Sequence, residues 1–333
     1  MRITAETLHK IALDTVASRA RTDHTLLAVY LQGSLLGEAP LLGNTADIDL
    51  FLVHTEEVPL QRELVRLTDE VHLDISQHDH RQYRQPRSLR LHPWLGPAVY
   101  GCKILYDPQH FMDFTQASVR AQFYRPDNVI ARCNQQAEHA RQIWMDLSSA
   151  TEAAGPAEAR NYLRSLDHAV NAIACISGPP LSERRYLLDF PGRAAEIGHP
   201  GLAAGLLGLL GGPAAEVERL RGWLADWQAA YLALAADAPP TRLHPYRLLY
   251  YQRGISALLE GEHPQYCLWP LWHTWTHIMA ALPTDSTHRS AWLSAGERLG
   301  LLGEAYASRV EALDAYLDQI EEILEQWGHE NGV

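Results

Sequence analysis

Three aspartates in the first quarter of the chain have the types and spacing that metal-dependent phosphate chemistry needs. Asp47 and Asp49 open an apolar run two residues apart, so on a strand both side chains lie on one face. Adjacent carboxylates repel each other unless solvent or a cation compensates them, and Mg²⁺ suits such a pair when phosphates complete its shell. Asp74 interrupts a second apolar run, Val71 to Ile75, which is unusual for a strand unless the carboxylate has a partner.

A Gly-Ser pair, Gly33-Ser34, follows the apolar run from Thr25 to Leu31. A glycine at this point lets the backbone approach a phosphate closely, the start of a helix offers free N–H groups, and Ser34 adds a hydroxyl donor. Each motif also has an ordinary structural reading. Asp-x-Asp can be a solvated strand end, and Gly33-Ser34 can be a strand-to-helix turn with Ser34 as the N-cap. The combination of the motifs favours phosphate binding.

In this combination the chain resembles the polymerase-β-like nucleotidyltransferase superfamily, whose pattern is Gly-Ser, then Asp-x-Asp, then an acidic residue on a later strand. The resemblance covers about the first third of the chain. It is greatest to two-domain bacterial members such as the aminoglycoside nucleotidyltransferases. Those enzymes have a small nucleotidyltransferase domain followed by a helical domain.

The resemblance implies a role for each of these residues. Asp47, Asp49 and Asp74 would be the catalytic metal ligands for two Mg²⁺ ions, and Asp74 would also take the proton from the attacking hydroxyl. Gly33 and Ser34 would hold the phosphates of a nucleoside triphosphate, with ATP as the expected substrate. Lys103 is a weaker candidate for a phosphate contact.

The apolar patterns and the resemblance together predict an α+β fold. Residues 1–110 would form a nucleotidyltransferase fold, which is a small mixed sheet with flanking helices, and residues 111–333 an all-helical domain. The expected strands are Thr25 to Leu31, Ala46 to His54, Val71 to Ser76 and Val99 to Tyr106. The expected helices of this part are Thr4 to Arg21, a short one from Ser34, and one from Pro59 to Glu70. Arg81, Arg84, Arg87 and Arg90 would form a basic stripe if they share a helix; a solvated face is the favoured interpretation.

After Phe111, strand signals give way to helical periodicity with Pro and Gly at the boundaries. The expected helices are Asp127 to Ser149, Pro156 to Ser177, Pro213 to Ala236, Pro245 to Glu260, Pro264 to Leu282 and Gly303 to Trp327.

This helical part offers further polar candidates without a supporting pattern. A carboxylate such as Glu138, Asp167 or Glu183 could serve as the acceptor-side base that some relatives have. His273 and His277 could bind Zn²⁺, but the tryptophans around them favour an aromatic core or a pocket wall.

Composition limits the class of protein. The formal net charge of the 333 residues is −12, which argues against nucleic acid as a partner. The four cysteines are far apart and the N-terminus has no signal-peptide pattern, so a reduced cytoplasmic protein is expected. No apolar run reaches the length of a membrane span. The sequence leaves open whether the protein forms an oligomer.

The sequence therefore predicts an enzyme that moves a nucleotide, expected to be AMP, from Mg-NTP to an acceptor hydroxyl. A small molecule such as an aminoglycoside is the first acceptor considered. A protein-modifying enzyme of the AMPylating or toxin-system type is an alternative. A non-catalytic nucleotide-binding regulatory protein is an alternative of another class.

Overall fold

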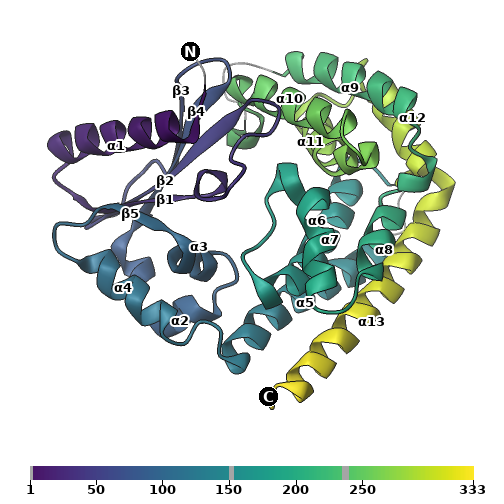
Figure 1. Ribbon diagram of the computed structural model, residues 1–333. Helices are drawn as coiled ribbons and strands as arrows, with labels where there is room; N and C mark the ends of the chain where they lie inside the picture. Colours follow the sequence, from purple (N-terminus) through teal and green to yellow (C-terminus); the bar gives the residue numbers. More distant parts are fainter. Residues whose placement is uncertain (1–2, 150–153, 235–239) are drawn as a thin grey trace. The chain divides into compact units, whose positions relative to one another are not determined.

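The computed structural model describes residues 3–149, 154–234 and 240–333. Its contacts divide the chain into two compact units, Met1–Asn128 and Val129–Val333. The first unit contains a five-stranded mixed sheet with helices, and the second is mostly helical, so the protein is α+β (Figure 1). The sequence put the change at residue 111, where strand signals end. Helix α4 (Phe111–Arg120) nevertheless packs against α2 (Pro86–Leu91) and α3 (Leu95–Gly101).

The sheet has the strand order β3-β4-β2-β1-β5. Strands β2 and β4 are parallel, and every other pair is antiparallel. The bounds are β1 Leu26–Gln32, β2 Ala46–His54, β3 Arg62–Arg66, β4 Val71–Asp79 and β5 Lys103–Tyr106. The central strands β1, β2 and β4 carry long apolar runs that are buried, as expected for strands covered on both faces.

Each face of the sheet has its own apolar layer. Helix α1 (Ala5–Thr22) covers one face, where Leu8, Ala12 and Val16 pack against alternate residues of the central strands. Thr4 caps this helix by accepting a hydrogen bond from the Thr7 N–H. The opposite face carries Ala28, Tyr30 and Val53, which pack with residues of α3 and α4. Alternation puts Asp47 and Asp49 on this second face, because Ala46, Ile48 and Leu50 belong to the first.

The predicted helix from Pro59 to Glu70 is wrong. This segment contains the edge strand β3, which pairs antiparallel with β4 after a tight turn over residues 67–70. The spacing of Leu60, Leu64 and Leu67 is typical of a helix, but Leu60 and Leu67 are exposed and form no buried face. Strand pairing therefore overrode a weak helical pattern.

Two further expectations for the first unit need correction. The strand expected from Val99 begins only at Lys103, because α3 continues through Gly101. The four arginines from Arg81 to Arg90 do not share one helix: a 3₁₀ helix (His80–Tyr83) precedes α2, and the extended Gln85 before Pro86 separates them. The short helix expected from Ser34 is confirmed as a 3₁₀ turn, Ser34–Leu36.

The described part of the second unit consists of α-helices, with short 3₁₀ turns in several of the connections. Their bounds are α5 Pro126–Ser148, α6 Pro156–Ser177, α7 Tyr186–Glu196, α8 Gly201–Leu209, α9 Val217–Leu232, α10 Leu248–Leu259, α11 Leu268–Ala281, α12 Arg289–Leu299 and α13 Tyr306–Glu330. The six predicted helices of this region are confirmed in position. The start of α9 is later than predicted because residues 212–214 form a 3₁₀ turn, and the predicted end at Ala236 lies outside the described residues. Helices α4, α7, α8 and α12 were not predicted.

Helix α11 is the buried centre of the helical unit. Trp272 stacks on Trp292 of α12 at 5.4 Å between ring centroids, and the Trp227 indole N–H of α9 donates to Thr274 Oγ1 at 2.9 Å. The aromatic-core interpretation of this stretch is therefore the one that the structure supports. Across the described ranges, no helix is both long enough and apolar enough to cross a membrane.

Candidate metal centre

The parallel pairing of β2 and β4 brings the three predicted aspartates together. Asp49 is directly opposite Asp74 in the ladder, and Asp47 is two residues before Asp49 on the same face. One carboxylate oxygen from each of the three lies within 4.8 Å of the others. Among the described residues, this is the one group of three or more acidic, His or Cys side chains with such spacing.

The cluster is mostly removed from solvent, and a cationic side chain already contacts it. Asp47 is 7% exposed and Asp74 is 3% exposed. Arg62 of β3 donates to both oxygens of Asp74, from Nε to Oδ1 at 2.7 Å and from Nη2 to Oδ2 at 2.6 Å. The Arg62 side chain is itself 48% exposed, so it reaches from the solvent side into the acidic cluster. Positive charge at this place is what three close carboxylates require.

Gly33 packs directly on the Asp49 carboxylate. A Cβ atom on Gly33 would lie 2.0 Å from Asp49 Oδ2, and the φ angle of +81° is one that L-residues with side chains rarely adopt. The next residue, Ser34, has a buried Oγ that makes no hydrogen bond within the described part of the chain. Gly33 is the N-cap residue of the 3₁₀ turn, so Ser34 is not the N-cap that the alternative interpretation required.

These residues fit a divalent cation by their donor chemistry. Three carboxylates supply hard oxygen ligands, and the absence of a side chain at Gly33 leaves the space that the Asp49 carboxylate occupies. A buried hydroxyl without a partner costs free energy, and a phosphate oxygen is an acceptor that would satisfy it.

Lys103 does not join the cluster. It is exposed at the start of β5 and pairs with Leu31, whose side chain belongs to the layer beneath α1. Residues paired in a ladder share a face, so Lys103 lies on the opposite face of the sheet from the aspartates.

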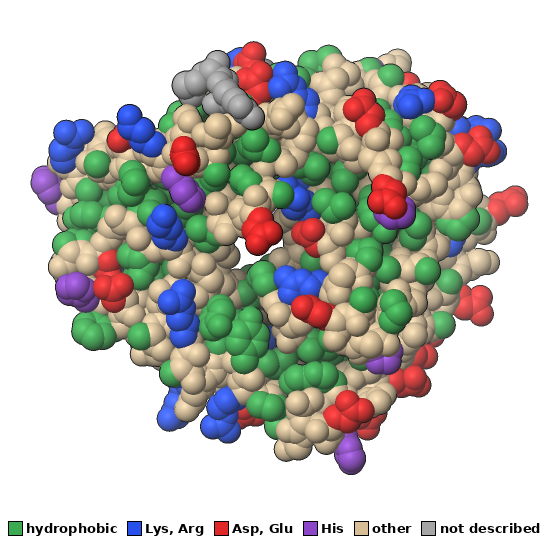
Figure 2. Space-filling view, in the orientation of Figure 1, with side chains coloured by type: hydrophobic (Ala, Val, Ile, Leu, Met, Phe, Trp, Pro, Cys, Tyr) green, Lys and Arg blue, Asp and Glu red, His purple; other side chains and the backbone are tan. Residues whose placement is uncertain are grey.

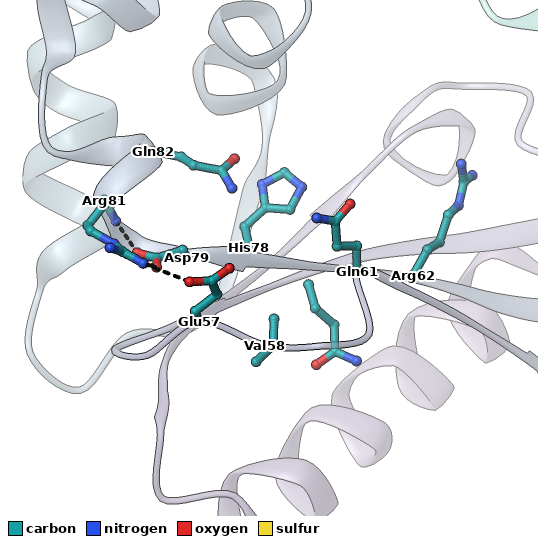
Figure 3. Close-up of a pocket in the computed structure, with 9 residues that line it drawn as sticks. Glu57, Val58, Gln61, Arg62, His78, Asp79, Arg81 and Gln82 are labelled. Atoms are coloured by element: carbon teal, nitrogen blue, oxygen red, sulfur yellow. Dashed lines mark hydrogen bonds and ion pairs between the residues drawn. The ribbon is translucent and has the colours of Figure 1, made fainter.

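A cavity of about 570 Å³ lies beside β3, β4 and the following 3₁₀ helix, with Arg62 at its border (Figure 3). His78 of β4 also lines it, on the same face of the sheet as Asp74. The His78 Nδ1 is 2.7 Å from the Tyr83 hydroxyl, which is 2.8 Å from the Tyr30 hydroxyl. Burial lowers the pKa of His78 and raises the pKa values of Tyr30 and Tyr83, so all three groups are neutral at pH 7.

The helical unit has a separate polar cluster built from two of the three candidate bases. His273 Nδ1 and the Tyr251 hydroxyl contact the two oxygens of Glu183 at 2.5 Å and 2.8 Å, and Arg242 pairs with the same carboxylate at 3.1 Å. Burial raises the pKa of nearby Asp167 to about 6. Glu138, the third candidate, is exposed on α5.

Sequence reasoning missed Arg62. The segment around it was assigned to a helix, so its alignment with β4 could not be foreseen. The available signal was the Thr68-Asp69-Glu70 turn between two short runs, which is typical of a hairpin.

Comparison of the chain with protein-family models and with curated proteins gives no match. The function is therefore inferred from the residues of the site.

Proposed function

We propose that the protein is a metal-dependent nucleotidyltransferase whose catalytic residues lie in the first unit. The observation that carries this proposal is the pairing of Asp49 with Asp74 across β2 and β4, with Gly33 packed on Asp49. Three carboxylates on one face, beside a glycine turn and a hydroxyl without a partner, suit a metal-bound triphosphate. The mixed sheet is compatible with the nucleotidyltransferase fold that the motifs resemble.

In this proposal Asp47, Asp49 and Asp74 would hold Mg²⁺, and the bound ion would supply positive charge close to the attacked α-phosphate and the leaving pyrophosphate. Gly33 allows the triphosphate to approach the backbone, and Ser34 Oγ donates to a phosphate oxygen. Asp74 lies within the cluster and accepts the proton of the acceptor hydroxyl. The nucleotide is proposed to be AMP, and the acceptor a small hydroxylated molecule such as an aminoglycoside.

Two alternative functions are also proposed, and each would give a different experimental result. A protein side chain could be the acceptor, and the same residues would then perform the same transfer. A non-catalytic nucleotide sensor would bind Mg-NTP without turning it over. The presence of all three carboxylates together with Gly33 and Ser34 favours an enzyme over a sensor.

The deciding experiment measures pyrophosphate release and covalent transfer from labelled ATP with Mg²⁺, against a panel of aminoglycosides and a cell lysate. Asp47→Asn and Asp74→Asn keep the side-chain shapes but remove a charge, so we expect transfer to fall by on the order of a hundredfold or more. The matched control is Asp69→Asn, which changes an exposed carboxylate in the β3–β4 turn that pairs with Arg66.

The product identifies the acceptor class. A labelled aminoglycoside supports the small-molecule acceptor, and a labelled lysate protein supports the protein-modifying alternative. Mg-ATP binding without transfer to either favours the sensor. Equal transfer by wild type and both Asn variants contradicts the proposed site.

A further inference from the structure

Arg62 borders two places with different chemistry, the acidic cluster and the 570 Å³ cavity. It pairs with both oxygens of Asp74 and lines the cavity with its half-exposed side chain. Figure 3 shows Arg62, Gln61, His78 and Gln82 extending to one side of the strands. The guanidinium of an arginine at such a border can contact either the acidic cluster or the cavity through side-chain rotation alone, without a change in the backbone.

The second arginine of the cavity is held in place by acidic partners. Arg81 pairs with Asp79 through its side chain and its backbone N–H, and it also lies 3.6 Å from Glu57. The two carboxylates of Asp79 and Glu57 therefore outnumber its single positive charge in the cavity wall, so Arg81 adds no net positive charge for an anion. Arg62 differs, because its partner Asp74 belongs to the cluster that would bind a cation.

The hydrogen-bond chain behind His78 determines which ring nitrogen carries the proton. Tyr30 is fully buried, and its hydroxyl has no partner among the described residues except Tyr83. All protons are satisfied only if Tyr30 donates to Tyr83 and Tyr83 donates to His78 Nδ1. The reverse direction would leave the buried Tyr30 proton without an acceptor. His78 is therefore the Nε2–H tautomer, which gives the cavity a neutral hydrogen-bond donor.

We propose that this cavity is an oxyanion site for a phosphate-class ligand, bound by Arg62 once a divalent cation has replaced the guanidinium on Asp74. The inference rests on the metal binding of the proposed function. A cation on the three aspartates would compete with Arg62 for an oxygen of Asp74 and would repel the guanidinium. Arg62 then presents its planar donors to the cavity, where guanidinium groups bind phosphate oxygens in a bidentate manner.

The other cavity donors fit the same ligand class. His78 Nε2–H and the side-chain amides of Gln61 and Gln82 donate hydrogen bonds without adding charge, and the cavity volume accommodates a phosphate or a pyrophosphate. The ligand could be free pyrophosphate or the terminal phosphates of a bound nucleotide, which share this chemistry.

The first measurement uses the metal alone. Mn²⁺ binding is followed at pH 8 by the electron paramagnetic resonance signal of free Mn²⁺, for wild type, Arg62→Gln, Arg62→Lys and Arg66→Gln. Removing the competing guanidinium should tighten Mn²⁺ binding about tenfold in Arg62→Gln, while Arg62→Lys, which keeps a cation, stays near wild type. Arg66 lies on the same strand face and pairs with Asp69, so Arg66→Gln is the matched control.

The second measurement is calorimetric titration with pyrophosphate, and with an ATP analogue that has a methylene bridge between its α and β phosphates. Each titration is run in saturating Mg²⁺ and in EDTA. With Mg²⁺, Arg62→Gln should bind at least one of these ligands about tenfold more weakly than wild type, whereas in EDTA the two proteins should agree within about twofold. Arg62 dependence for pyrophosphate identifies the free anion, and dependence for the analogue alone identifies the nucleotide.

The outcomes separate the two proposals. If no variant binds Mn²⁺, the metal site of the proposed function fails, and this inference fails with it. If Mn²⁺ binds but Arg62→Gln binds it no more tightly than wild type, only the exchange of Arg62 is overturned. An equal loss of oxyanion binding with and without metal also overturns the exchange. Thermal unfolding of each variant confirms that the proteins compared are folded.

Discussion

Gly33 meets two requirements of its position that side-chain-bearing residues cannot meet together. Its backbone has a φ of +81°, and the Asp49 carboxylate occupies the volume where a Cβ would lie. A methyl group there has to displace the Asp49 carboxylate or rotate the turn, and either change disturbs the acidic cluster or the backbone beside it.

We therefore expect Gly33→Ala to lose metal-dependent transfer by about a hundredfold or more and to destabilise the protein by roughly 1–3 kcal/mol. Steady-state kinetics and urea unfolding measure the two effects.

Ser34→Ala is the companion variant. Because the buried Ser34 Oγ has no hydrogen-bond partner in the part of the chain that the structure describes, its removal should leave stability within about 0.5 kcal/mol while weakening Mg-NTP binding. Loss of stability without loss of binding in Ser34→Ala would contradict its assigned role.

At the residue scale, the sequence was most informative where chemistry imposes a pattern. The proximity of Asp47 and Asp49 follows from their spacing. Asp74 could be recognised as a candidate because a carboxylate between apolar residues of a strand requires a partner. Arg62 could not be foreseen, because a surface arginine has many partners in principle and only the strand register selects one.

At the scale of elements, α6 and α11 carry partly buried acidic and basic side chains with opposed pKa shifts. Burial raises the pKa of Asp167 on α6 to about 6, and Asn171 Nδ2 donates to its Oδ1 at 2.9 Å. Burial, together with the neighbouring His273 and Arg242 side chains, lowers the pKa of His277 on α11 to about 3.

These shifts predict a pH-dependent effect of Asp167→Asn. The folded protein holds the Asp167 proton more tightly than the unfolded chain, so between pH 4 and pH 6 this group reduces stability progressively as pH rises. The variant lacks this loss and can still accept the Asn171 hydrogen bond. We expect it to be as stable as wild type near pH 4 and more stable by about 2 kcal/mol at pH 7.5. Urea unfolding at both pH values tests this, and a constant difference would contradict the assignment.

Elements were predicted well where a single physical signal dominated. The helices of the second unit have long apolar periodicity and Pro or Gly boundaries, and α6 matches its prediction from Pro156 to Ser177. Strand β3 was missed because it is short, lies at the sheet edge and is flanked by two exposed leucines, Leu60 and Leu67, at helical spacing. Its strand state depends on pairing with β4, which local sequence does not encode.

At the scale of the molecule, charge is distributed unequally between the two units. Residues 1–128 contain 13 basic and 16 acidic residues, and residues 129–333 contain 15 basic and 24 acidic residues. Figure 2 shows acidic and basic side chains interspersed on one face. The excess negative charge therefore belongs mainly to the helical unit, and it would attract cationic acceptors there.

Tryptophan is also distributed unequally, which makes the units separately observable. Eight of the nine tryptophans lie in residues 129–333, and Trp94 alone lies in the first unit.

Saturating Mn²⁺, at about a hundred times its dissociation constant, should raise the unfolding temperature of the first unit by on the order of 10 °C. Hydrogen exchange of sheet peptides should report this shift, while the tryptophan fluorescence transition stays in place. Asp47→Asn should abolish the shift. Equal movement of both signals would mean that the units unfold together.

Because β2 and β4 pair directly, the register between the two strands decides which side chains of β4 face the site. Asp49 faces Asp74, and successive side chains alternate between faces, so a slip of one residue would turn Asp74 into the layer beneath α1 and bring Leu73 or Ile75 to the site. A slip of two would restore the face but shift the carboxylate by roughly 6.6 Å along the strand. We therefore expect insertions to be tolerated in the loops on either side of β3, residues 55–61 and 67–70. A single extra residue absorbed into β2 or β4 would remove the site from a sheet that otherwise still forms.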